Sequence, residues 1–136
     1  SPIVQTERPE TIIIPVSSMG DVSDTRKQIL QNTLEDELKT HFRLVPQQRF
    51  EEVQEKVFEE LEYQEYTEDQ CNMMIQEMLQ VENVFHLQVI GEGSDTQLSL
   101  GWRTLDEKKK ETDICLKCGT FQLNDKVRGL VGKLVG

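Results

Sequence analysis

The residues best suited to chemistry are three cysteines, Cys71, Cys115 and Cys118, the last two in a Cys-x-x-Cys motif. This motif can hold a disulfide, exchange thiols or supply two zinc ligands. In an extended strand, Cα atoms three residues apart lie about 10 Å apart, so a disulfide here needs a turn, which Gly119 can permit. A redox pair normally stands at a helix N-terminus, whereas this pair closes a predicted strand. Oxidoreductase activity is therefore disfavoured.

A zinc site would need further ligands beside the motif, and Cys71 and His86 are the soft candidates. One Cys-x-x-Cys pair is a weaker zinc signal than two. We therefore predict neither a metal nor a cofactor. The remaining interpretations are a structural disulfide, between Cys115 and Cys118 or between Cys71 and one of them, and simple buried thiols.

No other set of residues indicates catalysis. His41 is expected to cap a helix C-terminus, and His86 is expected to pack or hydrogen-bond within a strand. The loop after the first predicted strand has only Gly20, which is too few glycines to cradle a phosphate. The many glutamates have no cleft that would raise the pKa of one of them. We predict that the chain is not an enzyme.

A long acidic segment is the candidate surface for a protein partner. Residues 51–69 hold nine carboxylates against the single Lys56. Aromatic residues beside charge are common in contact surfaces, and such a surface would steer a basic partner. The alternative is an ordinary solvated helix with two packed tyrosines at its end. The candidate residues are Glu55, Glu59, Glu62, Tyr63 and Tyr66.

Apolar spacing predicts five strands and four helices in the order βαβααβββα. Ser23 and Thr67 are expected N-caps, the latter in a capping box with Gln70. Residues 17–21 are expected to form a loop, and residues 106–110 a charged turn. The predicted strands are 11–16, 42–45, 83–90, 97–103 and 111–118, and the predicted helices are 23–40, 47–61, one from 67 and one from 123.

These elements predict an α/β fold. Two right-handed crossovers followed by a meander give a mixed five-stranded sheet in the order 2-1-3-4-5, with helices packed on it in layers. The strand at 83–90 is expected to have cover on both faces, and Ile114 and Leu116 to share one side of the last strand. We expect residues 1–10 to be a flexible leader and residues 11–136 to form a single domain.

Charge and hydropathy exclude several classes of function. The 136 residues carry a formal net charge of -10, which argues against binding to nucleic acid or to anionic lipid. No apolar run is long enough to span a membrane, and no secretory signal is visible. We therefore expect a protein partner.

Several short strings and the order of elements follow a known pattern. A hydrophobic strand leads into a helix, a small helix with a cysteine precedes a strand ending in glycine, and a hairpin carries an acidic turn. The strings are 12–16, 67–71, Ile75, Leu79, 81–84, 98–100 and Asp106. They resemble the CsgG-like and TolB N-terminal-like domains of bacterial envelope proteins. The resemblance covers residues 11–135 and implies a non-catalytic protein-binding module in the periplasm or at the outer membrane, within a longer protein.

The sequence also departs from that pattern. Relatives often carry a second cysteine shortly before the position of Cys71, where Tyr66 or Thr67 stands here, so their disulfide does not transfer. Two alternatives to the envelope module stay open. One is a domain that binds metal or senses redox state through its thiols, and the other is a cytosolic sensor or recruitment adaptor with reduced cysteines.

Overall fold

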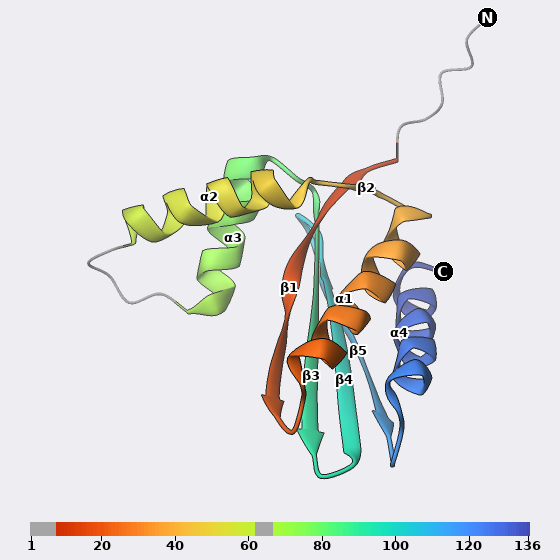
Figure 1. Cartoon of the computed structure of the whole chain (residues 1–136). Coiled ribbons are helices and arrows are strands. Elements are labelled where there is room, and N and C mark those ends of the chain that lie inside the picture. Colours follow the sequence, from red (N-terminus) through yellow and green to blue (C-terminus); the bar gives the residue numbers. More distant parts are fainter. Residues whose placement is uncertain (1–7, 62–66) are drawn as a thin grey trace, which may run out of the picture.

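The structure is a computed structural model that describes residues 8–61 and 67–136 (Figure 1). Its elements follow the predicted order. The strands are β1 (Glu10–Gly20), β2 (Arg43–Leu44), β3 (Asn83–Glu92), β4 (Asp95–Arg103) and β5 (Lys108–Cys115). The helices are α1 (Asp24–Lys39), α2 (Gln47–Glu60), α3 (Glu68–Leu79) and α4 (Thr120–Val135).

The five strands form one mixed sheet in the order β2-β1-β3-β4-β5, as predicted. β1 runs parallel to β2 and to β3, while β4 is antiparallel to β3 and to β5. The parallel pairs follow from the helical crossovers, and the antiparallel pairs follow from short turns. The α/β fold class and the strand order are therefore confirmed.

The main hydrophobic core lies between one face of the sheet and helices α1 and α4 (Figure 1). Strand residues alternate between the two faces, and every second residue of β3 points into this core. The β3 residues are Phe85, Leu87 and Val89, and each is fully buried. They meet Leu98 and Leu100 of β4 and the apolar stripes of the two helices, which are Leu30, Leu34, Leu38, Leu123, Val127, Leu130, Val131 and Leu134.

A second, smaller core lies against the opposite face, at one end of the sheet only. Helices α2 and α3 pack there, at the upper end of the sheet in Figure 1. From the sheet they contact Ile12, Ile14 and Val84. The helices and their flanking residues contribute Val45, Phe50, Val57, Ile75, Leu79 and Val81.

The predicted N-caps of α1 and α3 are confirmed. The Ser23 hydroxyl accepts a hydrogen bond from the Arg26 backbone N–H at 3.0 Å. The Thr67 hydroxyl accepts one from the Gln70 N–H at 3.2 Å, and the Gln70 side chain accepts from the Thr67 N–H at 2.8 Å. These contacts satisfy backbone donors that the first turn of a helix otherwise leaves unpaired.

The prediction of a loop at 17–21 is wrong for most of its length, because β1 continues to Gly20. The register of β1 against β3 shifts between Ile14 and Ser17, and Pro15 lies within this shift. Proline has no backbone N–H, so at this irregular position it interrupts no hydrogen bond of the ladder. The Val16 N–H bonds instead to the Gln31 side chain at 3.0 Å. The strand ends where Gly20 adopts a positive φ of 74°.

The last strand also differs from its prediction. β5 covers Lys108–Cys115, so Lys108, Lys109 and Lys110 belong to the strand and not to the turn. Ile114 is 59% exposed, because no helix covers its side of β5 within the described residues. Leu116 was predicted to share that side of the strand, but it follows the end of β5 and is 69% exposed. The final helix begins at Thr120, three residues before the predicted start.

None of the helices in the described ranges combines the length and the apolar composition needed to cross a bilayer.

Truncating the centre of the main core tests this arrangement. Leu87→Ala should lower the free energy of unfolding by about 2–5 kcal/mol in urea titrations, because the cavity in the central strand cannot collapse. Phe121→Ala, at a site that is 78% exposed, should change it by less than about 0.5 kcal/mol. Equal effects of the two substitutions would contradict the burial of β3.

Candidate functional site

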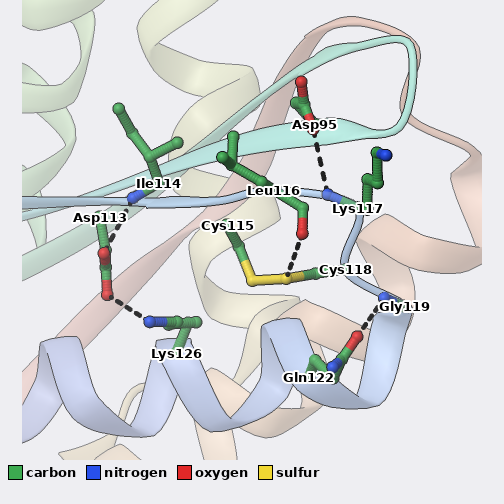
Figure 2. The surroundings of a disulfide bond; sticks show 10 residues. All are labelled: Asp95, Asp113, Ile114, Cys115, Leu116, Lys117, Cys118, Gly119, Gln122 and Lys126. Atoms are coloured by element: carbon green, nitrogen blue, oxygen red, sulfur yellow. Dashed lines mark hydrogen bonds and ion pairs between the residues drawn. A yellow bond between two sulfur atoms is a disulfide. The ribbon is translucent and has the colours of Figure 1, made fainter.

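The structure joins Cys115 and Cys118 in a disulfide at the junction of β5 and α4 (Figure 2). The two Cα atoms lie 5.7 Å apart, because the chain turns sharply between them. The residue that makes this turn is Lys117, whose φ is 52°, and not Gly119, which was expected to permit it. Gly119 is instead the N-cap of α4, where its N–H donates to the Gln122 side chain at 2.8 Å.

Two further hydrogen bonds hold this junction. The Lys117 N–H donates to the Asp95 carboxylate at the start of β4, at 3.0 Å (Figure 2). The Arg26 side chain of α1 donates to the Thr120 hydroxyl in the first turn of α4, at 3.1 Å. Cys115 is buried in the main core, whereas Cys118 is half-buried. The disulfide therefore fixes the start of the helix that covers the sheet.

The third cysteine lies apart from this pair. Cys71 is a free thiol in α3, at the end of the sheet opposite the β5–α4 junction (Figure 1). In residues 8–61 and 67–136, no three His, Cys, Asp or Glu side chains are grouped closely enough to hold a metal ion. The structure therefore does not gather the three thiols into one site.

His86 lies in the strand expected for it, whereas the C-cap of α1 is Thr40 and not His41, which was expected to cap that helix. His86 lies in β3, and its Nε2 is 3.0 Å from the Ser17 hydroxyl of β1. His41 follows Thr40, the C-cap of α1, and is exposed.

The acidic surface predicted on α2 combines carboxylates with an aromatic residue. Glu55 and Glu59 are both exposed, and they line a shallow depression together with Glu51, Gln54 and Phe58. We call these five residues the α2 stripe. Its opposite side packs Phe50 and Val57 into the smaller core. The other predicted residues of this surface, Glu62, Tyr63 and Tyr66, lie outside the described residues.

Phe58 is the aromatic residue of the α2 stripe. It is 55% exposed, and the three glutamates around it form no ion pair with another described residue. Aromatic residues are enriched in protein interfaces, whereas glutamate is depleted at their centres.

The sequence did not identify a second surface, which lies on the sheet itself. Beyond the area that α2 and α3 cover, the face opposite α1 and α4 has no helix over it in the described part of the chain. Met19 and Ile114, on this face, are 61% and 59% exposed. Strand register arranges its residues in rows, of which one is Met19, Ile90, Gln97 and Ile114 and the next is Ser17, Gln88, Ser99 and Thr112. We call these two rows, with His86, Gly101 and Lys110 of the following row, the open face.

The open face ends beside α3 in a basic groove. The groove holds about 280 Å³ and is lined by side chains of α3, β3, β4 and β5. Arg103 and Lys108 share the Asp69 carboxylate at 3.6 and 3.3 Å, respectively. Lys110 is exposed and forms no ion pair with a described residue. The groove is therefore lined by three cations and one carboxylate, in a chain whose net charge is -10.

The expectation of cover on both faces of β3 is correct only at Val84. Val84 is buried under α2 and α3, while His86, Gln88 and Ile90 are half-exposed. The polar residues at alternate positions of β3 and β4 could have indicated an exposed face, because a strand covered on both faces is apolar throughout. The basic groove gave no such signal, because Asp69 comes from an element distant in the sequence.

Comparisons with solved structures show which proteins share this fold. The LpoB C-terminal domain from Salmonella enterica matches with a TM-score of 0.58 and 11% identity, over 82% of this chain and 84% of that one. The same domain from Escherichia coli gives 0.52 and 13%, over 79% and 84%. Lipoprotein GNA1162 from Neisseria meningitidis gives 0.50 and 11%, over 93% and 96%. All three are bacterial proteins.

No protein-family model matches the sequence, and no curated protein matches it either. The resemblance to CsgG-like and TolB N-terminal-like domains therefore remains an interpretation of short strings. The solved structures support the coarser statement that the chain has the fold of domains from bacterial envelope proteins.

Thiol chemistry tests the site at the β5–α4 junction. Unreduced protein should show one titratable thiol after denaturation, that of Cys71, and three after reduction. Reduction should lower the free energy of unfolding by about 2 kcal/mol, because a loop this short constrains the unfolded chain only modestly. Cys71→Ser should keep this difference, and Cys115→Ser with Cys118→Ser should abolish it. Three titratable thiols before reduction would contradict the pairing.

Proposed function

We propose that this chain is a non-catalytic module of a bacterial envelope protein, and that it binds another protein through the α2 stripe. The observation that carries the proposal is Phe58, an exposed aromatic ring among Glu51, Glu55 and Glu59. An aromatic anchor can supply most of the binding energy once surrounding residues exclude water. The carboxylates around it favour a partner with a basic surface and speed its approach.

The envelope location is supported by two independent observations. The chain shares its fold with a neisserial lipoprotein and with the LpoB C-terminal domain of two enteric bacteria. Its Cys115–Cys118 disulfide suits an oxidising compartment such as the periplasm, whereas a cytosolic adaptor would keep these thiols reduced. Neither observation requires an enzymatic activity.

A crosslinker placed on the stripe tests the proposal. A photoreactive phenylalanine analogue at position 58 should give one dominant adduct in native cells, because the bound partner covers that ring. The same analogue at position 121, exposed on α4, should not give this adduct. Glu55→Lys with Glu59→Lys should reduce the adduct several-fold, while Glu92→Lys, an exposed charge reversal on β3, should leave it unchanged.

The purified partner should then bind the wild-type chain and lose affinity for the Phe58→Ala variant by about tenfold or more. Adducts of equal yield at positions 58 and 121, or binding unaffected by Phe58→Ala, would contradict the proposal.

A further inference from the structure

The open face has two chemically different ends. The row of Met19, Ile90 and Ile114 is mainly apolar, and the basic groove with Arg103, Lys108 and Lys110 lies at the other end. The row of Ser17, Gln88, Ser99 and Thr112 separates them with hydroxyl and amide groups. Met19 and Ile114 in this row are 61% and 59% exposed, and contiguous exposed apolar residues mark interaction sites.

The dimensions of this surface match one helix. The three rows of the open face and the Arg103–Lys108 row of the basic groove together span about 20 Å along the strands, and four strands span about 14 Å across. At 1.5 Å per residue, about 13 helical residues fit this length, and one helix covers the width. The same sheet already buries its other face under helices, so a helix is the element that its twist and spacing accommodate.

Charge specifies the chemistry of that helix at the basic groove. Asp69 is shared by Arg103 and Lys108, which leaves this trio with an excess of one positive charge. Lys110 extends from β5 into the same groove and has no carboxylate among the described residues. A carboxylate of a partner would pair with the excess positive charge of the groove. The local positive potential would attract it to the groove, although the net charge of the molecule is negative.

We propose that the open face binds an amphipathic helix of a partner protein, with apolar side chains on Met19, Ile90 and Ile114 and acidic side chains in the basic groove. The inference rests on the chain being a protein-binding module. The open face is a different surface from the α2 stripe. It requires an acidic partner segment, whereas the α2 stripe favours a basic one. The two proposals can therefore fail independently.

A designed probe tests this surface on the full chain. The probe is a 13-residue helical peptide with leucines along one side, three glutamates at one end and a fluorophore at the other. Fluorescence anisotropy should show saturable binding to the wild-type chain. Lys108→Glu with Lys110→Glu should weaken binding about tenfold or more, and Ile114→Asp should weaken it similarly. A peptide with glutamine in place of glutamate should bind as weakly as the wild-type peptide binds the lysine variant.

Matched variants provide the controls. Lys133→Glu lies in the last turn of α4, and Phe121→Asp lies in its first turn, on the helix that covers the other face. Both should bind the probe within about twofold of wild type, because neither changes the open face. Thermal unfolding of every variant should confirm that it is folded.

Three results would overturn the inference. The first is binding no tighter than that of a scrambled peptide of the same composition. The second is binding that survives both the lysine reversals and Ile114→Asp. The third is sedimentation showing that wild-type chains associate through this face, with the same variants abolishing the association, because the occupant would then be a second copy. None of these results would alter crosslinking at position 58.

Discussion

The structure depends on the alternation of β3, the central strand of the sheet. Phe85, Leu87 and Val89 must be buried on one face, so α1 and α4 are held against it. Phe85 also stacks on Trp102 of β4 with ring centroids 5.4 Å apart, which fixes the register at that end. On the opposite face, Val84 is buried under α2 and α3. His86, Gln88 and Ile90 follow on the same face, and no helix in the described residues covers them. The position of the open face follows from this unequal cover.

The net charge of -10 is not spread evenly, because one surface is acidic and the other is basic. The α2 stripe has Glu51, Glu55 and Glu59 around an exposed ring. The basic groove gathers Arg103, Lys108 and Lys110 around one carboxylate. Surface charges more than a Debye length apart, about 8 Å at physiological ionic strength, are largely screened from one another. The two proposed surfaces therefore call for partner segments of different charge.

Much of this fold was predictable from local sequence. The apolar spacing of the helices, the caps at Ser23 and Thr67 and the crossover rule were sufficient to order the elements and the sheet. The extension of β1 past Pro15 was not predictable, because it depends on the Gln31 side chain satisfying the Val16 N–H. The same holds for the turn at Lys117, whose N–H is held by Asp95 from another strand.

The candidate sites divide in the same way. The acidic helix was visible as a run of glutamates, but the exposure of Phe58 depends on which side of α2 meets the smaller core. The open face was less visible still, because its rows combine residues from four strands. How far α2 and α3 extend over the sheet is a property of tertiary packing, and no local pattern encodes it.

In residues 8–61 and 67–136, helices cover one face of the sheet and only one end of the other face. Hydroxyl-radical labelling of the free chain, read out residue by residue by mass spectrometry, tests this arrangement most directly. The account predicts strong labelling of Met19 and Ile114, at the level of exposed Leu105, and protection of Leu87 and Leu98. Protection of Met19 and Ile114 equal to that of Leu87 would contradict the account, because it would mean that the open face is covered in the free chain.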